Sequence, residues 1–178
     1  MQIRNSLVAT LIASVFAFTA PQAAFAEEAV SAAGASAPAA AVKQNDYVKP
    51  NMKHSSYGVL NIVVPITTDD KGIQGMKLRN IGNALRAAET WKGKINVTAV
   101  LYAKGVTLLK NPDEKIQKQL DDLSGKGVQI KVCDNSLREQ GIDFHTLYHV
   151  TDADIVPSGF AEVAYLQAKK HFVVDPVN

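Results

Sequence analysis

Apolar and polar residues follow two different periods from residue 57 onward, and these periods predict alternating strands and helices. Residues 57–67 form a nearly continuous β-branched apolar run, which is typical of a strand buried on both faces. Residues 74–91 carry apolar side chains at helical spacing, with polar residues at most of the other positions. Residues 95–102 alternate with a period of two, which predicts a second strand.

The alternation of elements continues after residue 102. Residues 111–113 (Asn-Pro-Asp) are typical of a helix start, and apolar residues follow at helical spacing until two nearby glycines. Residues 128–132 predict a third strand, residues 134–136 (Asp-Asn-Ser) are all favourable helix N-caps, and Gly141 is a favourable stop. The weaker pattern beyond predicts a short helix or irregular segment at 144–150, a brief strand at 155–157, a last helix that starts at Ser158–Gly159 and carries Phe160, Val163, Ala164 and Gln167, and a strand at 171–174.

Strands and helices that alternate at this spacing predict an α/β fold, with three α/β/α layers and a mostly parallel central sheet. Pro65, near the end of the first strand, is expected to mark where ladder pairing stops. Ligands of such sheets bind at the carboxyl ends of the strands. Three loops are expected to form that edge here, namely residues 68–72, 103–106 and 133–136.

The N-terminal sequence predicts a secretory signal peptide. Arg4 supplies a positive charge, residues 7–20 are apolar, and residues 24–26 (Ala-Phe-Ala) match a cleavage pattern. The domain organisation is therefore a cleaved signal peptide at 1–26, a flexible tether rich in Ala, Ser and Pro at 27–56, and a folded domain at 57–178. The expected location is the periplasm or the exterior, without a stable membrane anchor.

Composition excludes some classes of function. The 178 residues carry a formal net charge of +2, and Lys and Arg are interleaved with Asp and Glu. Nucleic-acid binding proteins usually show a strong basic excess, so nucleic acid is not an expected partner. Cys133 is the only cysteine, which excludes an intramolecular disulfide but leaves an intermolecular one open.

Cys133 is the candidate catalytic residue, because it lies between a strand end and a helix start. A thiol that faces a helix N-terminus can become a low-pKa thiolate. Two features of the residue types favour the other interpretation, in which Cys133 is structural. Free cysteine is often buried as a small hydrophobic residue, and the neighbouring Asp134 carboxylate should repel a thiolate.

Other polar residues give weaker candidates, and we predict neither a cofactor nor a metal. His145 and His149 have helical i, i+4 spacing, but no carboxylate or cysteine motif accompanies them as further ligands. Asp69 and Asp70 are adjacent, as turn residues often are, rather than placed for acid–base chemistry. Ser158 fits a helix cap, and the glycines after Asp70 lack the Gly-Lys-Ser/Thr sequence of a phosphate loop.

The order and spacing of several segments resemble the DsrE/DsrF-like family over residues 57–176. The cysteine segment, residues 127–137 (Gly-Val-Gln-Ile-Lys-Val-Cys-Asp-Asn-Ser-Leu), is followed by Gly141 and Ile142. The C-terminal part is similar at residues 156–159 (Val-Pro-Ser-Gly) and 164–167 (Ala-Tyr-Leu-Gln). Residues 80–84 and 100–109 fit the early helix and the second strand of the family.

This resemblance implies a compact α/β/α domain, of the YchN/TusD-like kind, that assembles into trimers or hexamers. In the sulfur-relay branch of the family, the cysteine that matches Cys133 carries sulfur as a persulfide between partner proteins. Those relay proteins work in the cytoplasm, whereas this sequence predicts an exported member. The first hypothesis is thus a sulfur carrier with at most a sulfur-transfer activity and a sulfur donor or acceptor protein as partner. The alternative is a non-catalytic oligomeric binding or assembly module in which Cys133 is structural.

Overall fold

The computed structural model describes residues 50–56 and 58–175. The predicted signal peptide at 1–26 lies outside the described residues, as does most of the predicted tether at 27–56. Residues 50–56 form neither a helix nor a strand, although the His54 ring packs edge-on against Trp91, with ring centroids 4.5 Å apart. Regular structure begins at Val59, close to the predicted start of the folded domain.

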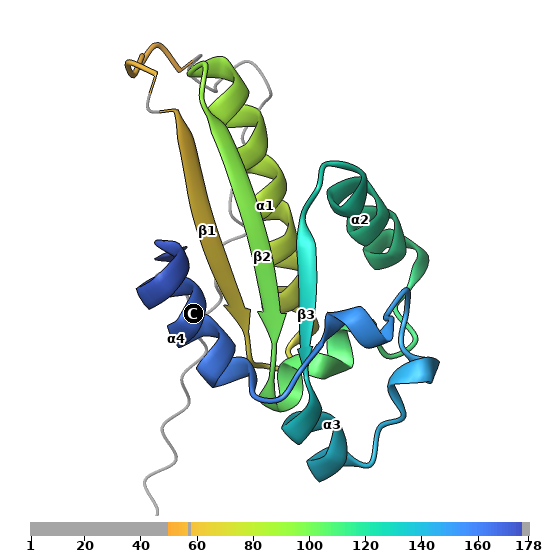
Figure 1. Ribbon diagram of the computed structural model, residues 1–178. Helices are drawn as coiled ribbons and strands as arrows, with labels where there is room; N and C mark the ends of the chain where they lie inside the picture. The colour runs from red at the N-terminus through yellow and green to blue at the C-terminus, as the bar shows by residue number, and fades with distance from the viewer. Residues whose placement is uncertain (1–49, 57, 176–178) are drawn as a thin grey trace, which may run out of the picture. The chain divides into compact units, whose positions relative to one another are not determined.

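The described strands form one five-stranded sheet in the order β4-β3-β2-β1-β5, and every neighbouring pair is parallel. The predicted mostly parallel sheet is therefore confirmed. Figure 1 shows the three longer strands side by side with their carboxyl ends at the same edge. The strands are β1 (Val59–Ile66), β2 (Lys94–Leu101), β3 (Gln129–Cys133), β4 (Ile155–Val156) and β5 (Val173–Val174).

Helices cover both faces of this sheet, which confirms the predicted three layers. Helices α1 (Lys71–Thr90) and α2 (Glu114–Gly125) lie on one face, and α4 (Gly159–Lys170) lies on the other (Figure 1). Within the described residues, no helix is both long and apolar enough to cross a membrane. Shorter helical segments fill the connections, namely η2 (Ala103–Leu109), α3 (Asp134–Gln140), η3 (Phe144–Thr146) and η4 (Asp152–Asp154).

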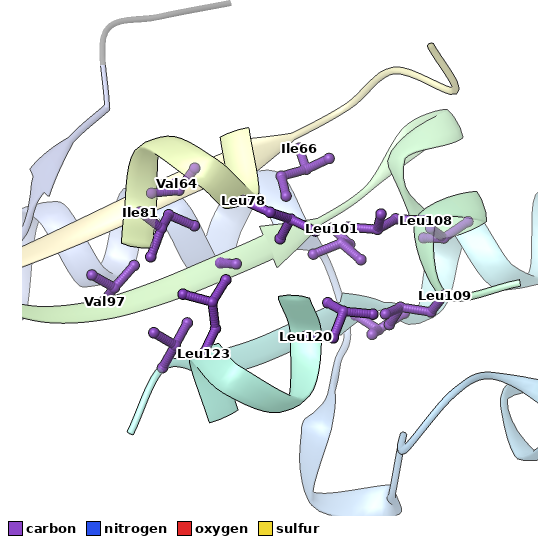
Figure 2. Close-up of a cluster of buried hydrophobic side chains, with 14 of the residues drawn as sticks. Val64, Ile66, Leu78, Ile81, Val97, Leu101, Leu108, Leu109, Leu120 and Leu123 are labelled. Carbon is purple, nitrogen blue, oxygen red and sulfur yellow. The ribbon is translucent and has the colours of Figure 1, made fainter. Parts of the chain in front are cut away.

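Alternation along the strands divides the apolar core into two clusters. Val64 and Ile66 point toward α1 and α2, whereas Val63 packs with Leu166 of α4 on the other face. Fully burying one such side chain stabilises the fold by about 1.5–3 kcal/mol. The larger cluster, drawn in Figure 2, includes Val64, Ile66, Leu78, Ile81, Val97, Leu101, Leu108, Leu109, Leu120 and Leu123.

Pro65 does not end the pairing of β1 with β2, so that expectation from the sequence is wrong on this side. The register continues past Pro65 to Ile66, whose carbonyl accepts from the Tyr102 N–H at 3.1 Å. The Val63 carbonyl instead accepts from the Asp175 N–H at 2.9 Å, on the β5 side. Backbone groups alternate along a strand, so the nitrogen of Pro65 also faces the β5 side, beyond the end of β5.

Helix α1 begins at Lys71, three residues before the predicted start at residue 74. Asp70 is its N-cap, and the Asp70 carboxylate accepts from the Ile73 N–H at 2.9 Å. Asp69 lies 3.5 Å from Lys104, with both side chains exposed. The two aspartates therefore act in a helix cap and a surface ion pair, in agreement with the turn interpretation.

Candidate functional site

The carboxyl edge of the sheet brings together the three loops that the sequence predicted there. Lys104, after β2, forms its ion pair with Asp69, after β1. The Ala103 N–H, also after β2, donates to the Ser136 hydroxyl oxygen at 2.7 Å. These contacts join the ends of β1, β2 and β3 at one edge of the sheet. Cys133, the only cysteine of the chain, lies at this edge.

Cys133 occupies the junction between β3 and α3. It is the last residue of β3 and the N-cap of α3, with extended backbone angles. The predicted caps at residues 134–136 instead lie in the first turn of the helix. Gly141 ends α3 in the left-handed conformation, with φ +60°, as predicted. The first N–H groups of a helix have no partner within the helix, and here those of Asn135 and Ser136 donate to the Cys133 sulfur.

Hydrogen-bond donors surround the sulfur of Cys133. Burial raises the pKa of the thiol, but hydrogen bonds from the Ser136 hydroxyl and from the backbone N–H groups of Gly159, Ser136 and Asn135 lower it by more, so that the pKa of Cys133 lies below its ordinary value. Cys133 is 4% exposed, as a packed cysteine would be. Its polar partners are all donors, and donors favour the thiolate over the thiol.

Ser136 is held so that its hydroxyl proton is available to the sulfur. Its oxygen already accepts the Ala103 N–H, which leaves the O–H free to donate. The Gln140 amide donates to the carbonyl oxygens of Ala103 and Ser136, at 2.8 and 3.0 Å, and ties the loop after β2 to α3. Ser136 is itself 4% exposed, so its geometry is fixed by buried contacts.

The Asp134 carboxylate does not oppose the thiolate in the way that the sequence predicted. It lies 2.9 Å from the Arg138 guanidinium, one turn further along α3. An adjacent cation offsets the negative field of the carboxylate. The pKa of Cys133 is lowered despite this neighbour, because the Ser136, Gly159 and Asn135 hydrogen bonds outweigh the effect of burial. Asp134 therefore does not prevent the lowered pKa of Cys133.

Gly159 contributes to the site from α4, which covers the face of the sheet opposite to α1 and α2. It is the first residue of α4, and its N–H reaches the sulfur. A β-carbon at Gly159 would lie 2.6 Å from the Tyr102 β-carbon, so only glycine allows this approach. The sequence predicts a helix start here, but no pattern in it connects this start, or Tyr102 and Ala103, to the cysteine. Only the expected convergence of loops at one edge pointed in that direction.

Replacing Ser136 with Ala should raise the pKa of Cys133 and reduce the thiolate fraction at neutral pH. A hydrogen bond to a charged group contributes about 1.5–3 kcal/mol, so alkylation of Cys133 at neutral pH should slow roughly tenfold. The measurement is the iodoacetamide rate against pH, and its midpoint should move to higher pH. Ser158→Ala is the control, because Ser158 caps α4 at Ala161 and donates nothing to the sulfur. If the two variants gave the same dependence of alkylation rate on pH, the Ser136 hydroxyl would have no part in lowering the pKa of Cys133.

The remaining candidates from the sequence lie elsewhere. His145 is exposed and pairs with Asp143, with 2.7 Å between ring nitrogen and carboxylate oxygen, while His149 lies 3.9 Å from Asp121. In residues 50–56 and 58–175, no three His, Cys, Asp or Glu side chains gather as metal ligands would. Ser158 is the N-cap of α4, as predicted.

Comparison with known proteins points to one family. The sequence pattern of the DsrE/DsrF-like family matches residues 60–176. Among solved structures, this chain is similar to a protein of unknown function, MTH1491, from Methanobacterium thermoautotrophicum, with 25% sequence identity and a TM-score of 0.57. The similarity covers 65% of this chain and 97% of that one. The comparison with curated proteins gives no match.

Proposed function

The chain belongs to the DsrE/DsrF-like family, and from this membership and the donors around Cys133 we propose that it is a sulfur carrier. The proposal assigns one chemical role to Cys133, which is to hold a sulfur atom as a persulfide. Membership alone gives a coarse expectation of sulfur relay. The residues that support the finer assignment are Ser136 and Gly159, whose hydrogen bonds favour the thiolate.

The proposed step is an exchange at sulfur that consumes no oxidant. The Cys133 thiolate attacks the outer sulfur of a donor persulfide, R–S–SH. The S–S bond of the donor breaks, a new S–S bond forms on Cys133, and R–S⁻ leaves with the electron pair. An acceptor thiolate later attacks the outer sulfur of the Cys133 persulfide and regenerates the Cys133 thiolate. The same donors stabilise the thiolate each time it is the leaving group.

The single observation that carries this proposal is the set of donors on the Cys133 sulfur. A structural cysteine packs among apolar groups, and burial among such groups raises its pKa. Here Ser136, Gly159 and Asn135 supply N–H and O–H groups from two helices, and the net pKa is lowered. Nucleophilic attack on sulfur requires the thiolate, so a lowered pKa is the property that this chemistry needs.

The burial of Cys133 means that a partner must gain access by moving part of the edge. Phe160 follows Gly159 directly, at the first turn of α4, and is 74% exposed. Large exposed aromatic side chains are enriched at sites of protein contact. We therefore propose that a donor or acceptor protein docks at Phe160. Contact there moves the first turn of α4, and with it the Gly159 N–H that donates to the sulfur.

Incubation with a sulfane-sulfur donor tests the proposed function. The full chain is reduced, treated with a small-molecule persulfide at neutral pH, freed of the donor and weighed by intact mass spectrometry. The expected result is a gain of one sulfur atom, which peptide mapping assigns to Cys133. An unchanged mass in a sample whose thiol still reacts with iodoacetamide would contradict the proposal.

Export of the carrier is also part of the proposal, and it rests on the sequence of residues 1–26. Cleavage after residues 24–26 (Ala-Phe-Ala) predicts a mature chain that starts at Glu27. The measurement is the intact mass and N-terminal sequence of the protein recovered from the periplasm of an expressing bacterium. Recovery of the chain in the cytoplasm, with Met1 or residue 2 at its N-terminus, would contradict export.

A further inference from the structure

A cavity of about 570 Å³ lies beside β3, away from the cysteine edge. Its volume falls in the range of roughly 300–1,000 Å³ that is typical of ligand sites. Helix α2, which lies beside β3 in Figure 1, supplies one wall, and the segment after η3 supplies the other. Apolar side chains from several elements form much of the lining, and they include Leu109, Leu120, Val128, Ile130 and Val150.

The cavity exposes part of a sheet edge. The direction of a residue's backbone groups in this sheet follows from the face on which its side chain lies. In β1, the Ile66 side chain is on the α1 face and its carbonyl points toward β2. The Val63 side chain is on the α4 face and its carbonyl points toward β5. All strands are parallel, so a residue of β3 on the α1 side points its backbone groups toward β4. Ile130 is such a residue, because it packs against the same cluster as Ile66.

Strand β4 is too short to pair with the backbone N–H and carbonyl of Ile130. Its register reaches only Val132 and Cys133, so within residues 58–175 no strand pairs with Ile130 on that side. The Ile130 N–H and carbonyl therefore face the cavity as one donor and one acceptor. This pair is the hydrogen-bonding pattern of one residue of an extended peptide, which can add to a sheet as a further strand.

Asp121 gives the cavity a negative charge that its described neighbours leave largely uncompensated. The Tyr148 hydroxyl donates to both Asp121 carboxylate oxygens, at 3.1 and 3.2 Å, and His149 is 3.9 Å away. The other carboxylate of the lining, Asp154, is already occupied, because it pairs with Lys131 and accepts from the Thr151 N–H and hydroxyl. A cation beside Asp121 would also lie near the edge-on rings of Tyr148 and His149.

We propose that this cavity binds an extended peptide segment that carries a lysine or arginine side chain. The peptide backbone pairs with the N–H and carbonyl of Ile130, and the basic side chain pairs with Asp121 beside Tyr148. The apolar walls accept the methylene stem of that side chain. The site is separate from the Cys133 chemistry, so neither its success nor its failure decides the sulfur-carrier proposal.

Titration of the ¹⁵N-labelled full chain with two capped tripeptides tests the site. The first probe is acetyl-Val-Lys-Val-amide, and the second has neutral norleucine in place of lysine. The lysine peptide should shift the Ile130 amide signal and bind about tenfold more tightly than the norleucine peptide, since a charged hydrogen bond is lost with norleucine. Equal binding of the two peptides, or an Ile130 signal that the lysine peptide leaves unmoved, would overturn the proposal.

Adjacent aspartates provide a matched pair of variants. Asp121→Asn should weaken the lysine peptide about tenfold, because it removes the charged partner. Asp122→Asn removes the same charge, but Asp122 pairs with Lys118 and does not line this cavity, so binding should be unchanged. An equal loss in both variants would show a general charge effect and overturn the site. Butylamine that binds as tightly as the peptide would overturn the role of Ile130.

Discussion

Gly105→Ala should destabilise the protein by more than about 4 kcal/mol, a loss found only in the extreme tail of point substitutions. A β-carbon at Gly105 would lie 1.8 Å from the Ile66 carbonyl oxygen and 2.9 Å from the Thr67 nitrogen. These are backbone atoms at the end of β1, and they cannot rotate aside as a flexible side chain could. The measurement is the free energy of unfolding from urea titration, with circular dichroism for variants that do not fold.

Gly125→Ala is the matched control for this prediction. Gly125 is the last residue of α2, and a β-carbon there would meet nothing within 4 Å. Alanine in a helix is about 0.5–1 kcal/mol more favourable than glycine, so this variant should be as stable as the parent or more so. If Gly105→Ala unfolds at the same urea concentration as Gly125→Ala, the close approach of η2 to the end of β1 is wrong.

Cys133→Ser should eliminate sulfur loading. The amount of sulfur per chain should fall by more than about a hundredfold, down to the background of the assay. A serine hydroxyl has nearly the shape of the thiol, but it is not ionised at neutral pH and forms no persulfide. Because Cys133 is the only cysteine, no second thiol can take the sulfur in its place. Intact mass after donor treatment measures the loss, and urea unfolding checks that the variant remains folded.

A different outcome in this experiment would favour the binding-module alternative. If Cys133→Ser keeps the cellular function of the parent, Cys133 contributes packing and not chemistry. Slower loading of Ser136→Ala is the intermediate case that distinguishes the two accounts. That variant retains the sulfur atom and loses only one donor, so it should load sulfur more slowly and still reach one sulfur per chain.

Local sequence patterns predicted most of the elements because the signals for those elements are local. The apolar run of β1, the helical spacing of α2 and the Ser158 cap of α4 each depend on neighbours within a few residues. Helix α1 was predicted too short because its first turn, Lys71 and Gly72, carries no apolar periodicity. The 3₁₀ helix η2 was missed because an irregular segment of this length shows no periodic pattern.

The composition of the cysteine site could not be predicted in the same way. Ser136 bonds to Ala103, which is 33 positions away, and the Gly159 N–H reaches Cys133 only because α4 returns across the sheet. Nothing near Cys133 in the sequence encodes those approaches. Phe160 is a further example, since its helical spacing suggested an apolar helix face, yet the side chain is exposed because α4 packs through Leu166 instead.

Cyanolysis of the loaded protein is the most direct test of the sulfur-carrier proposal. Cyanide removes the outer sulfur of a persulfide as thiocyanate and leaves the original thiolate, so the product counts carried sulfur atoms. The proposal predicts one thiocyanate per chain, return of the mass to that of the untreated protein, and none from Cys133→Ser. Absence of thiocyanate from the treated parent chain, or an equal yield from Cys133→Ser, would contradict the claim that Cys133 carries sulfur.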